Sequence, residues 1–497
     1  MKKKRIIIAG AGPAGLTFAY DLLKKSKKYE VIIFEESDSI GGIAKTINYK
    51  GNRIDIGGHR FFTKEKVIND LWEEILPISD DTNKDNILLK RKRVSRILFE
   101  NKFYDYPISL KFETLKNMGF IKTFNVIISY IKSIIFKRKE NNLEDFYINR
   151  FGKKLYSLFF RDYTTKVWGR TPSCIDSSWG KQRVKGISIR KVLSNALKRI
   201  FKIKDKNKET SLIEEFLYPK FGPGYLYEEM AKKIQELGGE IILNSKVIKI
   251  NNKNNTIKDI TVLSKDNEIN YKCDYFISSM PIKDLINGMD TPKKINRIAN
   301  NLPYRDFITF GILVKKLNIR NNTKIKTFNN RIPDTWLYVQ DNSVKLGRIQ
   351  VFNNWSPYMV KDNKKTVWLG LEYFCNEDDE FWKLSKKKSI EFAINELVKL
   401  NIIDKKNVID ATRIKIKKAY PAYFDSYSEL DKVIKYLNKI DNLYCIGRNG
   451  QHRYNNMDHS MMTALVAVDS LLNNKSKKEI WNVNTEDDYH EEKENEV

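Results

Sequence analysis

Three glycines near the start of the chain have the spacing of a nucleotide-binding turn. Gly10, Gly12 and Gly15 form a GxGxxG pattern directly after an apolar run, and Glu35 lies 20 positions beyond the last of them. The first glycine permits a tight turn, the second lets the backbone approach a pyrophosphate, and the third lets a helix pack on a strand. The start of that helix offers free N–H groups to phosphates, and Glu35 can accept hydrogen bonds from a ribose. The pattern predicts a dinucleotide-binding site.

Two further glycine pairs indicate which dinucleotide to expect. One pair, at 41–42, lies just beyond Glu35, and the other, at 57–58, directly precedes His59. The first pair resembles the extended motif of amine-oxidase-like FAD enzymes, in which the chain passes back over the cofactor. The second pair lets the backbone of a loop approach a flavin ring. We therefore expect FAD as the cofactor.

The elements that position these residues follow from the apolar pattern. Runs at 5–9 and 29–34 predict buried parallel strands, joined by a helix over 16–23. Later segments predict further strands and one more helix of the same domain: 238–250, 274–281, 442–448 and 457–472. The FAD-binding domain is therefore expected at the start, in the middle and near the end of the chain.

The expected fold class is α/β: a Rossmann-like FAD-binding domain with an inserted helical domain and an inserted, mostly antiparallel sheet domain. The expected boundaries are 1–105, 215–300 and 438–475 for the FAD-binding domain, 106–214 for the helical substrate or lid domain, and 301–437 for the substrate-contacting sheet domain. Residues 476–497 are rich in acidic side chains and are expected to form a disordered tail.

The charge balance alone identifies no partner. The 497 residues include 90 Lys and Arg against 62 Asp and Glu, a formal net charge of +28. The basic residues are dispersed and accompany no zinc-finger, RRM-like or helix-turn-helix signature, so we expect no nucleic-acid partner. The excess can steer an anionic small molecule or favour peripheral contact with an anionic membrane. The oligomeric state is left open.

The cysteines and the apolar runs bear on the compartment. Four cysteines, at 174, 273, 375 and 445, lie far apart without a CxxC pair, which is typical of a reducing compartment. No apolar run is long enough to span a membrane. The segment 124–136 predicts a buried amphipathic helix, with a membrane-surface helix as the alternative. We expect a cytoplasmic protein, with peripheral membrane association as the alternative, and no metal site.

Sequence blocks along nearly the whole chain resemble those of the UDP-galactopyranose mutase family. In family order they are 159–169, 180–184, 336–338, 354–357, 419–421 and 448–460. Their combination is far more specific than any single block. The resemblance implies a flavin-dependent isomerase of nucleotide sugars that serves the biosynthesis of cell-surface glycans.

The implied reaction is redox-neutral overall. A UDP-hexopyranose, with UDP-galactopyranose as the first candidate, would be converted to the UDP-hexofuranose through N5 of the flavin, so FAD is needed in its reduced form. The UDP-sugar is therefore the expected partner. By the same resemblance Arg183 and Arg348 bind its diphosphate, for which two rigid guanidinium groups are well suited.

The candidate site residues fall into three groups. Those implied to be catalytic are His59, Arg183, Arg348, Tyr420, Tyr454 and Asn456. Those expected to bind FAD are Gly10, Gly12, Ala14, Gly15, Glu35, Glu36, Gly42, Gly57, Gly58, His59, Val247, Gly447, Arg448, Met457, Asp458 and Ser460. Those expected to contact the UDP-sugar are Tyr106, Tyr163, Trp168, Arg183, Trp336, Tyr338, Arg348, Tyr420 and Tyr454.

Two departures from the family pattern leave the sugar open. Ser109 stands where the family commonly has a glutamine, and Trp355 stands where it has a tyrosine. An FAD-dependent oxidoreductase of the amine-oxidase or protoporphyrinogen-oxidase type is the first alternative, since it would share the fold and the FAD motifs. The second alternative is a basic flavin-binding protein that acts at a membrane or nucleic-acid surface.

Overall fold

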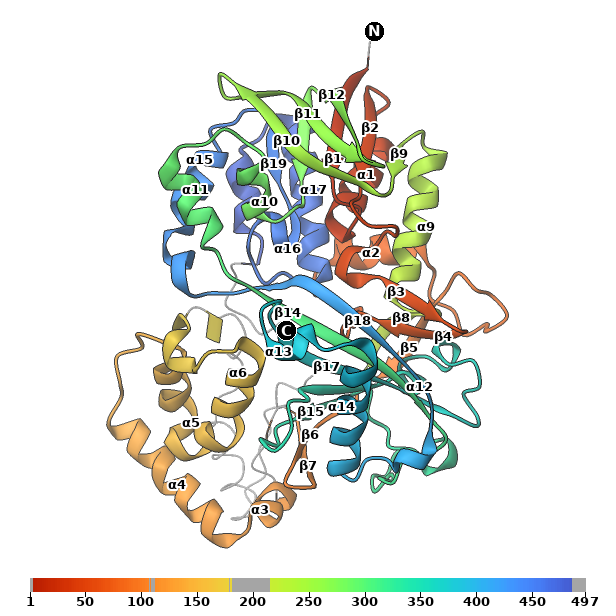
Figure 1. The fold of residues 1–497 in the computed structure, drawn as a ribbon, viewed down its shortest axis with the longest axis vertical. Coiled ribbons are helices and arrows are strands. Elements are labelled where there is room, and N and C mark those ends of the chain that lie inside the picture. The colour runs from red at the N-terminus through yellow and green to blue at the C-terminus, as the bar shows by residue number, and fades with distance from the viewer. Residues whose placement is uncertain (1–2, 107, 109–111, 178, 181–214, 485–497) are drawn as a thin grey trace.

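A five-stranded parallel sheet forms the upper part of the molecule in Figure 1. The structure is a computed structural model that describes residues 3–106, 108, 112–177, 179–180 and 215–484. In spatial order the strands are β19 (Leu443–Cys445), β13 (Tyr275–Ser278), β1 (Lys4–Ala9), β2 (Tyr29–Phe34) and β9 (Glu240–Ile242). Their apolar runs are buried on both faces, as in other parallel sheets. The strands predicted at 5–9 and 29–34 are therefore present.

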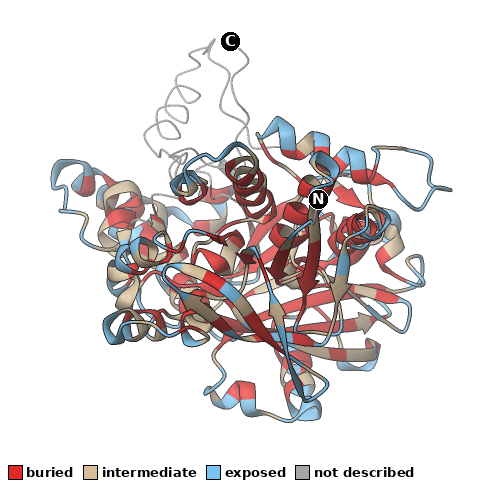
Figure 2. Ribbon diagram, turned by 90° about the horizontal axis from the view of Figure 1, so that it is seen from above, coloured by how far each residue is buried: buried red, intermediate tan, exposed pale blue. Residues whose placement is uncertain are grey.

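Separate layers cover the two faces of this sheet. Ile6 and Ile8 point into a core formed with α1 (Pro13–Lys25) and α17 (Met457–Asn473), whereas Ile7 points to the opposite face. The first layer also contains α2 (Lys66–Ile75) and α9 (Pro223–Glu236). The second contains β10 (Ser245–Lys253), β11 (Thr256–Ser264), β12 (Asn267–Lys272), α10 (Ile282–Asn287), α11 (Lys293–Asn300) and α15 (Leu430–Leu437). Figure 2 shows buried residues along both the strands and the helices that pack on them.

A seven-stranded sheet forms the lower centre of Figure 1. In spatial order its strands are β18 (Val408–Pro421), β14 (Tyr304–Val314), β17 (Val367–Cys375), β16 (Arg348–Val351), β15 (Trp336–Val339), β6 (Ser95–Phe99) and β7 (Lys102–Asp105). Neighbouring strands are antiparallel except β15 and β6, which are parallel. The predicted boundary at residue 105 is wrong here, because β6 pairs with β15 and β7 pairs with β6, so that residues 95–105 complete this sheet.

Helices form a separate lobe at the lower left of Figure 1. They are α3 (Phe112–Met118), α4 (Phe120–Ile135), α5 (Leu143–Phe159) and α6 (Arg161–Trp168). The backbones of α4 and α5 approach closely at Gly152, where an added Cβ would lie 2.8 Å from the Tyr130 Cα. The exposed loop predicted at 202–209 lies outside the described residues.

The remaining elements link these layers. They are the two-stranded sheets β3 (Thr46–Tyr49) with β4 (Asn52–Asp55) and β5 (Leu88–Lys92) with β8 (Glu215–Pro219), and the helices α12 (Phe352–Trp355), α13 (Glu380–Lys383), α14 (Lys386–Lys399) and α16 (Gly447–Gly450). Within the described residues no helix is long and apolar enough to cross a membrane. The same residues contain no group of metal-ligating side chains.

The start of the predicted disordered tail is ordered instead. The 3-10 helix η7 (Lys477–Asn482) packs on the body of the protein, where Ile480 and Trp481 are buried. The Gln451 Nε2 donates a hydrogen bond to the Ile480 carbonyl at 2.8 Å. The expectation of disorder from residue 476 is therefore wrong for 476–484, because these two apolar side chains anchor the segment. Residues 485–497, which hold the acidic run, lie outside the described residues.

Candidate active site

A cavity of about 860 Å³ lies where the parallel sheet, the seven-stranded sheet and the helical lobe meet. Among the predicted site residues that the structure describes, all line this cavity except Gly15. Arg183 lies outside the described residues. Segments from the two ends and the middle of the chain thus converge on one space.

The glycine turn forms one end of the cavity. Gly10 has a φ of +103°, which only glycine adopts readily, and a Cβ on Gly15 would lie 2.0 Å from the Gly10 carbonyl oxygen. Gly15 therefore serves the packing of α1 on β1, which explains why it does not reach the cavity. A Cβ on Gly12 would meet only Gly42 backbone atoms, at 3.7 and 3.9 Å. The space above Gly12 is open to a ligand.

Glu35 is buried at the end of β2 and holds the glycine turn. Its Oε2 accepts a hydrogen bond from the Ala11 N–H at 2.8 Å, and its Oε1 accepts from the Ser37 N–H and hydroxyl at 3.1 and 2.7 Å. A carboxylate offers about four lone-pair sites, so capacity remains for a ribose hydroxyl. Glu36, Lys246 and Val247 line the cavity beside it.

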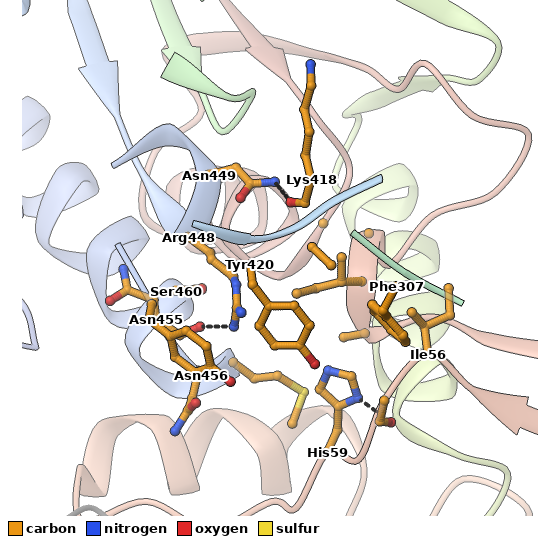
Figure 3. Close-up of a pocket in the computed structure, with 18 of the residues that line it drawn as sticks. Ile56, His59, Phe307, Lys418, Tyr420, Arg448, Asn449, Asn455, Asn456 and Ser460 are labelled. Atoms are coloured by element: carbon orange, nitrogen blue, oxygen red, sulfur yellow. Dashed lines mark hydrogen bonds between the residues drawn. The ribbon is translucent and has the colours of Figure 1, made fainter. Parts of the chain in front are cut away.

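Arg448 brings a positive charge to the cavity from the C-terminal end of β19. Its Nη1 donates to the Asn455 carbonyl at 3.1 Å, whereas its buried Nε and Nη2 have no partner within the described structure. The guanidinium lies 4.9 Å from the Tyr420 ring centre and 4.1 Å from that of Tyr454. Figure 3 shows Arg448 beside Tyr420 and joined to Asn455. Two buried donors without partners make this a site for an anion.

His59 lies on the loop after the 57–58 glycine pair. Its Nδ1 lies 3.1 Å from the Gly57 carbonyl oxygen, so Nδ1 carries the proton and Nε2 is an acceptor. Burial, assisted by the charge of Arg448, lowers the pKa of His59 to about 4, and the ring is neutral at pH 7. Figure 3 shows the Tyr420 hydroxyl pointing towards this ring.

Aromatic rings form the walls of the wider part of the cavity. Tyr106 stacks on Tyr338 at 4.0 Å, and Trp336 stacks on the same ring at 5.7 Å. Tyr420 and Tyr454 form a second stack at 5.6 Å. A further set of edge contacts joins Trp168 to its neighbours Trp179, Tyr420 and Tyr454. Such walls suit the flat faces of a base or sugar and exclude water.

Arg348 enters the same space from the first residue of β16. Its Nε donates to the Tyr163 hydroxyl at 2.8 Å, and its Nη1 donates to Glu372 at 3.2 Å. No hydrogen bond joins its Nη2 to a described residue, so this nitrogen can bind a ligand. Burial raises the pKa of Tyr163, which keeps the phenol protonated and able to donate a hydrogen bond of its own.

The C-terminal segment completes the cavity around the start of α17. Asn456 is the N-cap residue of this helix, and its backbone N–H donates to the His459 Nδ1 at 3.3 Å. Residues of the first turn, Met457, Asp458 and Ser460, line the cavity with Gly447. Another helix N-terminus therefore faces the ligand space.

Several lining or supporting residues are absent from the sequence-based site prediction. Ser37 donates a hydrogen bond to Glu35, and Arg60 lies over the Trp336 ring. Trp179 contacts Trp168, and Glu372 binds Arg348. Glu372 has no local motif and reaches the site only through strand pairing, where it lies directly opposite Arg348. Trp179 and Arg60 lie next to residues that the sequence analysis did predict. Their position beside these residues could have identified them as candidates.

One of the two departures from the family pattern lies behind the cavity. Trp355 is fully buried, its Nε1 donates to the Thr335 carbonyl at 2.8 Å, and it packs against Phe216 and Trp336. The indole therefore fills the core beneath Trp336 and does not line the cavity. Ser109 lies outside the described residues.

The glycine end of the cavity fits the pyrophosphate of FAD. The N-terminus of α1 has no side-chain cap, so its N–H groups remain available to phosphate oxygens. The open space above Gly12 admits the diphosphate, and the Nε and Nη2 of Arg448, which bind no described residue, can neutralise it. Positive groups and open backbone thus occur where a dinucleotide needs them.

Comparison with known families defines the class of protein. Residues 13–427 match the family described as "Flavin containing amine oxidoreductase". The match spans most of the chain, and the chain belongs to this family of flavin enzymes. Family membership implies a flavin cofactor, FAD, in agreement with the glycine motifs.

Individual relatives narrow the resemblance. A protein of Klebsiella pneumoniae named "Probable UDP-galactopyranose mutase" is 25% identical over 189 residues, which are 36% of this chain and 44% of the relative. The crystal structure of a reduced UDP-galactopyranose mutase has a TM-score of 0.80 at 22% identity, covering 98% of this chain and 97% of that one. Putrescine oxidase bound to putrescine has a TM-score of 0.60 at 13% identity, covering 95% and 99%. These structures show a shared mixed α/β fold, and the resemblance to the mutases predicted from sequence is confirmed.

Proposed function

We propose that this flavin enzyme is a mutase that converts a UDP-hexopyranose, with UDP-galactopyranose as the first candidate, into the UDP-hexofuranose without net redox change. The observation that carries the proposal is the position of Arg348. Its guanidinium lines an aromatic-walled cavity that is continuous with the glycine turn, and its Nη2 has no hydrogen bond to any residue that the structure describes. A cation and aromatic faces together suit a nucleotide diphosphate attached to a sugar.

In this proposal FAD occupies the glycine end of the cavity. Gly12 and the start of α1 bind its pyrophosphate, Glu35 binds the ribose, and Arg448 neutralises the phosphate charge. The parallel sheet and its two covering layers then form the FAD-binding domain, and the helical lobe and seven-stranded sheet form the substrate side. His59, on its glycine loop, presents its neutral Nε2 as an acceptor to the flavin ring.

The described site contains no side-chain nucleophile activated by a base. A reduced flavin supplies the nucleophile for the anomeric carbon of the sugar when it is bound. The chain's own residues orient the substrate and stabilise charge: Arg348 binds the diphosphate as UDP leaves, and the protonated Tyr420 donates a hydrogen bond beside it. Arg183 is proposed as the second diphosphate ligand.

The aromatic walls are proposed to select the nucleotide sugar. Tyr106, Tyr338 and Trp336 form a continuous stack on which uracil or a sugar face can lie. Enclosure by these rings also keeps water from competing with the sugar hydroxyl that recloses the ring.

Four free cysteines agree with a reducing, cytoplasmic setting.

An amine or porphyrinogen oxidoreductase is the second candidate, favoured by the family match. The charge of the cavity argues against an amine substrate. Arg348 contributes a cation to the wider part, and the carboxylate beside it, Glu372, is bound to that arginine. An ammonium group would therefore meet a site arranged for an anion.

The deciding experiment is an assay of the dithionite-reduced holoenzyme against UDP-galactose, UDP-glucose and the two UDP-N-acetylhexosamines. The expected result is an isomeric product on anion-exchange chromatography, with the flavin spectrum unchanged after turnover. Oxidised enzyme is the matched control and should give no product. Failure to isomerise any of these sugars, together with substrate-dependent flavin reduction by an amine, would assign the oxidoreductase instead.

A further inference from the structure

Helix α4 carries its apolar side chains on the outside of the molecule. Phe120, Ile121, Phe124 and Ile135 are 86%, 76%, 55% and 65% exposed. Further exposed apolar residues of the helix and its C-cap are Ile127, Ile128, Ile131, Ile134 and Phe136. The helix lies at the outer edge of the helical lobe in Figure 1. The prediction of a buried amphipathic helix at 124–136 is therefore wrong about which face is buried.

The spacing of these side chains places them on one face. Positions 120, 124, 127, 131 and 134 recur every three or four residues, and 121, 128 and 135 flank them. The opposite face packs on α5 through Val126, Tyr130 and Ser133, all of which are buried. The helix is thus already held on α5 by this face, and a continuous apolar stripe is left uncovered by the residues that the structure describes.

The charged residues of α4 and of the segment that follows it are basic. Residues 120–139 contain five Lys or Arg and no acidic residue. Lys122 pairs with Glu100, and Arg138 pairs with Asp145. Lys132, Lys137 and Lys139 are exposed and form no ion pair with any residue that the structure describes.

We propose that the apolar stripe of α4, with its basic border, docks the protein on the surface of an anionic lipid bilayer. An interfacial helix buries Phe and Ile side chains among the acyl chains while Lys and Arg contact the lipid phosphates. The stripe and border of α4 have this composition. This docking is independent of the mutase reaction proposed above.

The positive charge of the border favours a lipid bilayer over a second copy of the chain as the partner that covers the stripe. A symmetric dimer through α4 would place one basic border against another, because a twofold interface uses the same patch on both subunits. Like charges brought together in this way oppose association. An anionic surface complements both the stripe and its border.

The test is sedimentation of the holoenzyme with phosphatidylcholine vesicles that contain about 30% phosphatidylglycerol, against vesicles of phosphatidylcholine alone. The wild type should sediment with the anionic vesicles only. Hydrogen exchange on the vesicles should slow specifically at 120–136. Raising the ionic strength from about 0.15 M to about 1 M shortens the screening length and should weaken binding.

Two variants with matched controls separate the apolar and the charge contributions. Ile121→Gln with Phe124→Gln and Ile135→Gln should lower the partition coefficient about a hundredfold. Val67→Gln with Ile269→Gln and Ile409→Gln, at exposed apolar positions elsewhere, should leave it unchanged.

The charge variant combines Lys132→Gln, Lys137→Gln and Lys139→Gln. It should also lower the partition coefficient onto the anionic vesicles about a hundredfold. Its control, Lys386→Gln with Lys387→Gln and Lys388→Gln on α14, removes the same charge at a distant exposed site. Mutase activity without vesicles should stay unchanged in all four variants, because none touches the cavity.

Four outcomes would overturn the proposal. They are a wild type that does not sediment with anionic vesicles, equal binding to neutral vesicles, an apolar variant that binds as the wild type does, and a lipid-free dimer that the apolar variant converts to a monomer. The last result would assign the stripe to a second copy. Vesicle binding can be measured whether or not the wild type has mutase activity. Each of the two proposals can therefore be disproved without the other.

Discussion

Arg348 and Glu372 lie directly opposite each other on the paired strands β16 and β17, with 3.2 Å between Nη1 and Oε2. Glu372 is fully buried, and burial raises the pKa of its carboxyl group above the ordinary value. The Arg348 guanidinium beside it opposes this by lowering the same pKa. Strand pairing therefore fixes where the Arg348 charge lies in the cavity. A second bond, to Tyr163, sets its orientation.

Replacing Arg348 by lysine should lower kcat/KM for the UDP-sugar about a hundredfold. A lysine cannot bond Tyr163, Glu372 and a phosphate in the same fixed geometry, and charge-assisted hydrogen bonds contribute about 1.5–3 kcal/mol each. Steady-state assays of the reduced holoenzyme measure the change, and the flavin content should match the wild type.

Arg413→Lys is the matched control for this substitution. Arg413 lies on β18 and donates to the Leu384 carbonyl and the Ser389 hydroxyl, away from the cavity. It should retain full activity. Wild-type turnover by the Arg348→Lys protein would remove this arginine from the substrate site.

Gly12→Ala and Gly15→Ala should separate cofactor binding from folding. An alanine at 12 meets no atom closer than 3.7 Å in the protein but fills the space proposed for the pyrophosphate, so bound flavin should fall with little change in apoprotein stability. An alanine at 15 lies 2.0 Å from a carbonyl oxygen and should reduce both flavin content and the unfolding temperature. Flavin absorbance per mole of protein and thermal unfolding give the two readouts. Normal flavin content in Gly12→Ala would contradict the placement.

Arg448→Met should change the apoprotein and the holoprotein in opposite directions. The buried Nε and Nη2 of Arg448 have no partner among the described residues, and each such group costs about 1–3 kcal/mol until an anion binds it. The apoprotein of the variant should be as stable as the wild type or more so, while its FAD dissociation constant rises at least tenfold. Flavin fluorescence titration provides the measurement. An unchanged dissociation constant would show that the guanidinium does not contact FAD.

His452 should make the stability of the protein depend on pH. It is fully buried against the edge of Tyr304, and burial lowers its pKa to about 4, below the ordinary value near 6.5. The unfolded chain binds the proton first as pH falls, so about 3 kcal/mol of stability is present above pH 6.5 and is lost between about 6.5 and 4.

Urea unfolding at several pH values measures this dependence. His452→Asn suits the positive φ of 48° at this position and should be less stable at pH 7, with a shallower fall towards pH 4.5. Parallel pH profiles for the variant and the wild type would exclude His452 as the source.

The sequence predicted the residues that depend on local geometry. The glycine turn, Glu35 and the strands beside them have a fixed spacing, because a tight turn and a helix start leave little freedom. Glu372 could not be found in this way, since it reaches Arg348 through pairing of distant segments. The outward face of α4 was also hidden, because periodicity shows that one face is apolar but not which face meets the core.

The parallel sheet has a consequence for how the protein is made. Its strand β1 lies at Lys4–Ala9, whereas its outer strand β19 ends at Cys445 and is followed by Arg448, so the cofactor cavity is incomplete until these segments and the start of α17 have all left the ribosome. Strands so distant in sequence pair slowly, since the intervening chain must first be closed into a loop. A nascent chain stalled before β19 therefore lacks part of the cavity wall and should contain no flavin.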